Sequence, residues 1–306
     1  MKKIPNVHIT LFVLTFLTTL ITGAGYSDAN IFEKPWEIYK GLPFSLSLMA
    51  ILLSHEFSHF YASKRHHTEA TLPYFLPAPP FISPIGTFGA YIQMKSPIIT
   101  RKALIDIGAS GPVAGFILSV VASVVGLKYS TVVSAPPSDG VIGLGDSILF
   151  SFLTRLVIGD IPESHEILLH PVAFAGWIGL FVTSLNLIPI GQLDGGHIAF
   201  AFFRKMHKLL SRLLVGVLLV MGFVAILQLS DNILKTQIPY RLNIFVKKLP
   251  DLWAGWALWG VLMMVLGIKH PPVIYWEIPL DWKRRFIGAL AFIIFIITFM
   301  PSPFKI

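Results

Sequence analysis

Two histidines and a glutamate stand close together inside an apolar stretch of this sequence. His55, Glu56 and His59 occur in the segment SHEFSH, within the apolar residues 44–62. On a helix, positions four apart lie on one face, so His55 and His59 can bind the same metal ion. Glu56 is displaced by one position and can act as general base on a metal-activated water. Ionisable groups inside an apolar span are costly, which favours a functional zinc site over a structural polar cluster.

A second polar segment can supply the third ligand that such a site needs. Residues 186–197 read NLIPIGQLDGGH, in which a proline and several glycines interrupt a helix around Asp194. This segment and the histidine pair fall at the same end of their spans, so we expect Asp194 to complete a site for one zinc ion. The alternative for Asp194 is to serve as N-cap of a short helix over 195–208.

Three further polar residues have more than one interpretation. Asn186 can donate a hydrogen bond to an oxyanion that develops during acyl transfer, or it can form an interhelical hydrogen bond. His197 can compete as a metal ligand, although we favour a supporting role beside a site that already has three protein ligands. Asp106 can orient a ligand or cap a helix.

The composition of the whole chain defines the environment of these residues. Of the 306 residues, 54% are hydrophobic and only 13% are charged, and the mean hydropathy is +0.72. Soluble domains carry about 25% charged residues, so the composition excludes an ordinary cytosolic enzyme, a disordered chain and a nucleic-acid binder. There are no cysteines, which leaves the 10 histidines as the soft metal ligands. A membrane protein is expected.

Apolar stretches long enough to cross about 30 Å of hydrocarbon predict an all-α polytopic membrane protein with a bundle of six to seven transmembrane helices. The predicted organisation is an N-terminal span and outer loop over 1–43, a core over 44–208 and C-terminal transmembrane helices over 209–306. The predicted spans are 9–25, 44–62, 103–126, 170–190, 212–229, 252–268 and 286–300.

The net charge of +8 bears on orientation. Cationic loops stay in the cytoplasm, and their distribution favours an N-terminus and an active site on the cytoplasmic side. The first apolar run can be a retained helix, which we favour, or a cleaved signal peptide. A prokaryotic cytoplasmic membrane is the expected location.

Residues 73–97 are apolar but contain six prolines, so no continuous helix can pass through them. We expect a membrane-associated β-hairpin or re-entrant segment, in which GTFGAYI forms a strand. An unwound substrate can pair with the edge of the strand over Gly86–Met94, although the segment can equally be a packing element. The next span carries Gly108, Gly111 and Gly115, which we assign to close helix packing. The segment 147–158 in the outer loop is apolar enough to lie on the membrane surface.

These motifs together resemble one family. HEFSH in a predicted span, followed far downstream by HPVAFAGWIGLFVTSLNLIPIGQLDGGH, is similar to the site-2 protease family of intramembrane zinc metalloproteases. GTFGAYI and GASGPVAG resemble segments of the same family. The resemblance covers residues 44–208, with a weaker similarity in HPPVIY and PLDWKRR, and is closest to the subgroup without PDZ or CBS domains.

The resemblance implies roles for individual residues and a fold. His55, His59 and Asp194 would bind zinc, Glu56 would be general base and acid, and Asn186 would assist the transition state. Three central helices, here 44–62, 103–126 and 170–190, would form the catalytic core.

The function expected from these observations is an intramembrane zinc endopeptidase. Its substrate would be a single-span membrane protein or a signal-peptide-like segment in the lipid bilayer, with nucleic acid excluded and the oligomeric state open. A metal-ion transporter using the same residues is the alternative, and a non-catalytic scaffold is a third class. A carboxylate placed between two ligating histidines, and the lack of inverted repeats, favour the protease.

Overall fold

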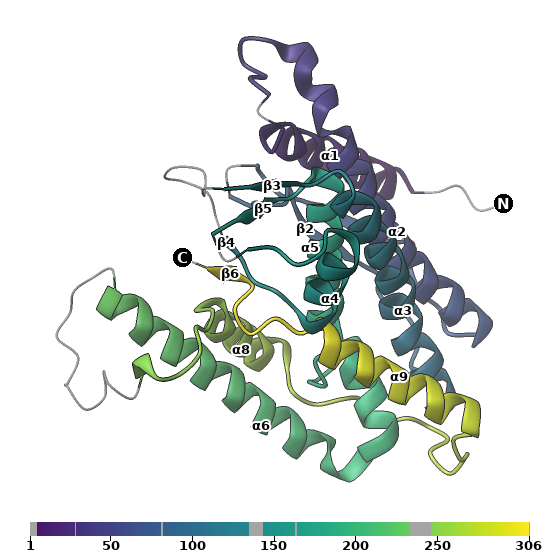
Figure 1. Cartoon of the computed structure of the whole chain (residues 1–306). Helices are drawn as coiled ribbons and strands as arrows, with labels where there is room; N and C mark the ends of the chain where they lie inside the picture. Colours follow the sequence, from purple (N-terminus) through teal and green to yellow (C-terminus); the bar gives the residue numbers. More distant parts are fainter. Residues whose placement is uncertain are drawn as a thin grey trace.

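The computed structural model describes residues 5–27, 29–80, 82–134, 143–162, 164–232 and 246–305, and most of this part of the chain is helical (Figure 1). Long apolar runs form the helices, and the one over Arg101–Leu127 continues through Pro112. The helical elements are α1 (Asn6–Gly25), the 3-10 helix η1 (Pro35–Gly41), α2 (Leu42–Arg65), α3 (Arg101–Leu127), α4 (Ile148–Val157), α5 (Pro171–Asn186), α6 (Asp194–Asn232), α8 (Gly255–Leu266) and α9 (Trp282–Thr298).

Short strands form three separate two-stranded antiparallel sheets. The pairs are β1 (Tyr74–Pro77) with β2 (Thr87–Tyr91), β3 (Thr131–Val133) with β5 (Glu166–Leu168), and β4 (Gly143–Leu144) with β6 (Phe304–Lys305). The β1–β2 pair matches the hairpin expected from the prolines and from GTFGAYI. Its association with a membrane stays a prediction.

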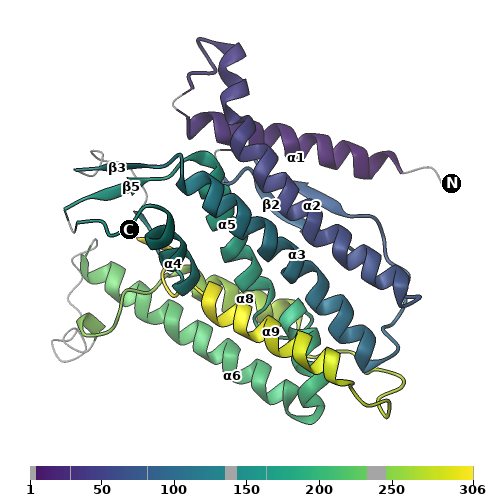
Figure 2. The same cartoon turned by 45° about the vertical axis from the view of Figure 1, so that its right-hand side comes forward.

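The core of the fold is the packing of α3 against α2 and α5, the three helices expected to be central (Figure 2). Small residues let the backbones of α3 and α5 approach closely. A Cβ on Gly126 would overlap the backbone of Ala173, and one on Gly179 would overlap Oγ of Ser119. Larger side chains at these positions would therefore push the two helices apart.

Four helical segments are long and apolar enough to cross a membrane, as judged over the described residues. They comprise α1, η1 with α2, α3, and most of α6. By contrast, α5 has 16 residues, α8 has 12 and α9 has 17. At 1.5 Å per residue, 16 residues span about 24 Å, less than the roughly 30 Å of hydrocarbon. Length and composition thus support four spans, and the expected six to seven stay a prediction.

The element α6 covers 39 residues and consists of two helical segments that meet at a kink, where Phe203 has non-helical φ −122° and ψ 38°. This agrees with the expectation of a short helix followed by a separate one, but the break lies at residue 203 and not between 208 and 212. The polar stretch around 204–212 belongs to the second segment. No proline or glycine occurs between 197 and 216, so no local signal in the sequence marks the kink.

The β1–β2 hairpin is braced by α1. His8 Nδ1 donates a hydrogen bond to the carbonyl oxygen of Pro73 at 3.0 Å. At the other end of the hairpin, Gly86 adopts φ +71°, and a Cβ there would lie 2.6 Å from the carbonyl oxygen of Thr18. Because β2 pairs only with β1, its outer edge carries no strand in the part of the chain that is described.

The outer segment expected on a membrane surface forms α4, a helix over Ile148–Val157. Ile148, Phe152 and Leu156 are spaced by four residues and are 65%, 59% and 68% exposed. Their spacing puts these apolar side chains on one face of the helix. This is consistent with the expected interfacial position, which stays a prediction.

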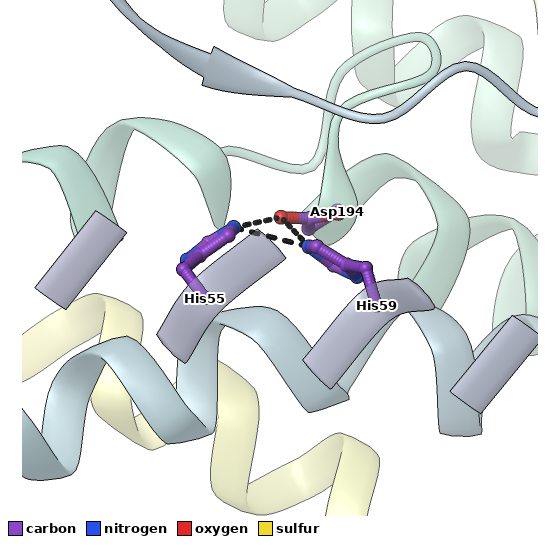
Figure 3. A group of neighbouring side chains, drawn as sticks. All are labelled: His55, His59 and Asp194. Atoms are coloured by element: carbon purple, nitrogen blue, oxygen red, sulfur yellow. Dashed lines mark hydrogen bonds and ion pairs between the residues drawn. The ribbon is translucent and has the colours of Figure 1, made fainter. Parts of the chain in front are cut away.

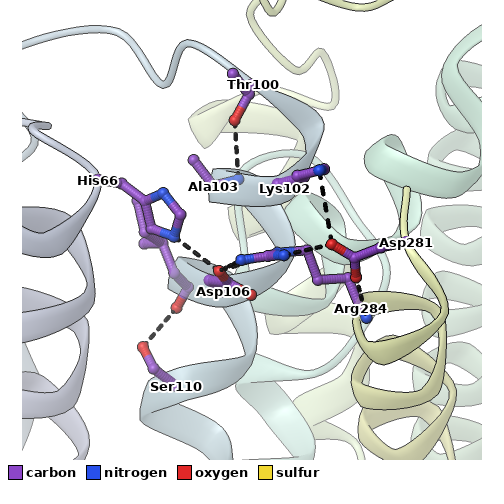
Figure 4. A network of polar contacts seen from close by, with 9 residues as sticks. His66, Thr100, Lys102, Ala103, Asp106, Ser110, Asp281 and Arg284 are labelled. Atoms are coloured by element: carbon purple, nitrogen blue, oxygen red, sulfur yellow. Dashed lines mark hydrogen bonds and ion pairs between the residues drawn. The ribbon is translucent and has the colours of Figure 1, made fainter. Parts of the chain in front are cut away.

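A polar network joins α2, α3 and α9 at one end of the bundle (Figure 4). Asp106 accepts hydrogen bonds from Arg284 Nη2 at 2.6 Å and Nε at 3.0 Å, and His66 Nε2 lies 2.7 Å from the same carboxylate oxygen. Arg284 also pairs with Asp281, which Lys102 approaches to 3.7 Å. Asp106 therefore ties three helices together.

In the described part of the chain, Asp106 neither orients a metal-ligand candidate nor caps a helix, the two roles considered from the sequence. The N-cap of α3 is Thr100, whose Oγ1 accepts a hydrogen bond from the Ala103 N–H at 3.1 Å. Asp106 lies six residues further along α3, and its hydrogen bonds within the described residues go to His66 and Arg284, not to a metal-ligand candidate. The helix-capping interpretation is wrong because Thr100 already fills that position.

Replacing Arg284 by Met should lower the free energy of unfolding by about 1–3 kcal/mol, because the partly buried Asp106 carboxylate would lose its charged donors. Thermal unfolding in detergent measures this. The matched control is Lys283→Met, whose exposed side chain should change stability by less than about 0.5 kcal/mol. Equal stability of the two variants would contradict the structural role of the network.

Candidate metal site

The structure brings His55, His59 and Asp194 together (Figure 3). The two histidines come from consecutive turns of α2, and Asp194 begins α6. The Nε2 atoms lie 3.0 Å apart, and Asp194 Oδ2 lies 3.3 Å from His55 Nε2 and 3.2 Å from His59 Nε2. The histidines are 6% and 5% exposed. Ligand atoms of residues 135 positions apart in the sequence therefore meet at one buried position.

The protonation of His59 can be read from its other ring nitrogen. His59 Nδ1 lies 2.8 Å from the carbonyl oxygen of Ile107, which can only accept, so Nδ1 carries the proton. In the neutral ring, Nε2 then presents a lone pair toward His55 and toward the Asp194 carboxylate. A hydrogen bond of this kind fixes the orientation of ligating histidines in metal sites.

The three convergent atoms fit zinc. Lone pairs that meet in a buried site repel one another unless a cation or a proton lies between them. Zinc takes nitrogen and oxygen ligands at about 2.0–2.1 Å, and a tetrahedron of that size has ligand atoms about 3.3 Å apart. The observed separations of 3.0, 3.3 and 3.2 Å agree with this edge. His55, His59 and Asp194 would hold the ion.

The glycines of α3 form the wall behind this site. A Cβ on Gly111 would overlap the His59 ring, and one on Gly115 would lie 3.2 Å from His55 Nδ1. A Cβ on Gly108 would lie 3.0 Å from the carbonyl oxygen of Asp194. From the sequence, we predicted only a role in helix packing for these three glycines. The structure shows that they also leave room for the candidate ligands.

Replacing Gly111 by Ala should therefore weaken zinc binding about 10-fold or more, because the added methyl group displaces the His59 imidazole. Zinc content and affinity of the purified protein measure this. Gly216→Ala is the control, since a Cβ there meets nothing within 4 Å and alanine favours the helix. Unchanged zinc affinity of the Gly111 variant would contradict the proposed ligand geometry.

A tight turn between α5 and α6 positions Asp194. Gly191 adopts φ +55°, a conformation that glycine reaches without strain. Gly195 packs so closely that a Cβ would overlap the carbonyl oxygen of Leu187. The turn therefore folds back on itself, and the first residue of α6 is directed at α2.

Asn186 and Glu56 also lie at the site. Asn186 Nδ2 is 3.4 Å from His55 Nε2, on the last residue of α5. Glu56 is 6% exposed, and its carboxylate lies near the backbone of Ile92, just beyond β2. The end of the hairpin is thereby next to the glutamate.

His197 lies outside the group of three, and its Nδ1 is 2.6 Å from Nε2 of His270. Sequence reasoning did not select His270, and only its place in the segment HPPVIY, which resembles the family weakly, could have indicated it. Burial lowers the pKa of His270 to about 3, and the neighbouring His197 makes a smaller contribution in the same direction. This imidazole is therefore neutral at pH 7. The contact agrees with a supporting role for His197.

Comparison with known proteins connects this geometry to a family. Residues 43–229 match the model of peptidase family M50. The protein named "Probable zinc metalloprotease EGY2, chloroplastic" from Oryza sativa subsp. indica is 32% identical over 218 residues, 67% of this chain and 38% of that protein. "Probable zinc metalloprotease EGY1, chloroplastic" from Arabidopsis thaliana is 36% identical over 193 residues, 59% of this chain and 34% of that protein. No solved structure gives a significant match.

The site geometry and the family match agree with a family of zinc metalloproteases. This chain belongs to peptidase family M50, the site-2 protease family. The chain spans 38% of the length of the first of these curated relatives.

The family and the apolar helices indicate an integral membrane protein. The relatives named above carry chloroplast names and do not support the expected prokaryotic membrane. That location and the orientation stay predictions.

Proposed function

We propose that this chain is an intramembrane zinc endopeptidase that hydrolyses peptide bonds in or near transmembrane segments. The observation that carries the proposal is the convergence of two buried histidines and a carboxylate beside Glu56. Membership of a metalloprotease family supports the same reaction class. The substrate is a single-span membrane protein or a signal-peptide-like segment.

The roles of the side chains follow from their positions. His55, His59 and Asp194 would hold a zinc ion, which would supply Lewis acidity toward a water molecule and a substrate carbonyl. Glu56 accepts a proton from the attacking water and passes it to the leaving amine. Asn186 donates a hydrogen bond to the oxygen of the carbonyl under attack. Because these groups lie among apolar helices, their electrostatic interactions are stronger than in water.

Substrate recognition requires an unwound segment, since a transmembrane helix hides its carbonyl groups in its own hydrogen bonds. The unpaired edge of β2 offers backbone groups for an added strand. The backbone of Ile92, next to this strand, lies near the proposed base Glu56. A substrate paired there would bring a peptide bond next to the catalytic carboxylate.

We further propose that the site opens toward the cytoplasmic side of a prokaryotic cytoplasmic membrane. The cationic segments support this orientation. The substrate chain would be taken from the lipid bilayer, and nucleic acid has no role.

Replacing Glu56 by Gln should leave zinc content unchanged and lower the cleavage rate by about 10²–10⁴, because the general base is lost while the ligands stay. Cleavage of a single-span substrate in detergent, with zinc analysis of the same samples, measures both. Glu166→Gln, on the exposed strand β5, is the matched control.

The same variant separates the protease from a transporter. If the chain were a transporter, the wild type would move zinc into vesicles without cleaving any substrate. The Glu56→Gln variant would then lose zinc transport. Cleavage by Glu56→Gln at the wild-type rate would refute the proposed catalytic role.

Replacing Phe88 by Pro should abolish cleavage and leave zinc content intact, because proline removes a backbone N–H from β2. Phe88 is 64% exposed and faces the irregularity in the β1–β2 register, so its side chain is not part of the core. Phe88→Ala, which keeps the N–H, is the control and should cleave. Equal cleavage by the two variants would exclude substrate pairing at this position, and the same test applies to Tyr91→Pro.

A further inference from the structure

The segment that joins α8 to α9 lies against the turn that carries Asp194. We call residues 267–281 the strap. Gly267 begins the strap with φ +100°, and its carbonyl oxygen lies so close to Gly191 that a Cβ on Gly191 would overlap it. The backbone of the strap therefore contacts the turn three residues before Asp194. The strap lies beyond the family match, which ends at residue 229.

The strap reaches the first turn of α6 through a chain of hydrogen bonds. His270 Nδ1 lies 2.6 Å from the carbonyl oxygen of Pro271, which can only accept, so Nδ1 carries the proton. The neutral ring then accepts at Nε2, and His197 Nδ1 donates to it at 2.6 Å. The direction of both bonds is fixed by the carbonyl group at one end.

His197 lies three residues after Asp194, so both side chains project from nearly the same face of α6. On the side of α3, a Cβ on Gly108 would lie 3.0 Å from both the Asp194 carbonyl oxygen and the His197 Cβ. The first turn of α6 is therefore held between α3 and the strap. A shift of His197 would move the Asp194 carboxylate with it.

Further contacts keep the strap in place. The His270 ring stacks on Phe200 at 4.2 Å with an interplanar angle of 13°. The guanidinium groups of Arg101 and Arg204 lie 4.6 and 4.8 Å from the centre of the Trp276 ring. Cation–π pairs of this kind contribute about 0.5–2 kcal/mol each. The strap thus has its own anchors on α3 and α6, independent of the bond to His197.

We propose that His270 is a positioning residue for the metal site. By accepting the hydrogen bond of His197, it holds the first turn of α6 where the Asp194 carboxylate meets His55 and His59. The inference rests on the proposed zinc site. It assigns a role to a residue outside the part of the chain that matches the family.

The test uses the full chain, purified in detergent and stripped of metal. Zinc affinity is measured by competition with a chromophoric chelator, and Co²⁺ absorption reports the geometry of the bound ion. His270→Phe keeps an aromatic ring on Phe200 but removes the acceptor, so it should bind zinc about 10-fold or more weakly and change the Co²⁺ spectrum. His270→Gln keeps an acceptor and should restore most of the affinity. His165→Phe, in an outer segment, is the matched control and should bind like the wild type.

The outcomes separate the inference from the proposed function. Absence of zinc binding by the wild type would overturn the metal site itself. Wild-type binding together with an unchanged affinity in His270→Phe would overturn only the positioning role. His197→Phe removes the donor of the same bond, so the double variant should be no weaker than either single one. If the Phe variants do not fold, His270→Gln decides, because a 10-fold loss of affinity with the acceptor retained would refute the inference.

Discussion

The structure depends on three atoms with lone pairs that are directed at one buried point. His55, His59 and Asp194 bring their ligand atoms within 3.3 Å of one another among apolar helices. Without a cation or shared proton, this arrangement costs free energy, since burial removes the water that would otherwise solvate each group. The surrounding packing has to hold α2, α3 and α6 together against that repulsion. A positive ion at the centre converts the same geometry into a stabilising interaction.

The helix α3 serves both packing and chemistry. Its small residues let α5 approach on one side, while Gly108, Gly111 and Gly115 admit the candidate ligands on another. The Ile107 carbonyl oxygen on the same helix fixes the tautomer of His59. One helix therefore leaves room for the three candidate ligands and fixes which nitrogen His59 can offer. Close packing and a metal site are here two consequences of the same absence of side chains.

The chemistry of the site is also supported by segments that carry no metal ligand. Hairpin β1–β2 brings Ile92 to the proposed base, α1 braces that hairpin, and the strap contacts the turn that carries the third ligand. The metal ligands themselves occupy two short segments. The site is compact in space but depends on five separated stretches of the chain.

The sequence by itself determined that this is an apolar membrane protein and that two histidines share a helix face with a glutamate beside them. It also determined that prolines prevent a continuous helix in the segment before α3. These are local properties, set by periodicity and by the backbone limits of proline and glycine. Tertiary structure alone decided that α6 is kinked at residue 203, that Asp106 pairs with Arg284 rather than caps α3, and that His270 meets His197. These outcomes depend on contacts between residues 73 and 178 positions apart, or on the absence of any local signal, and no pattern along the chain records them.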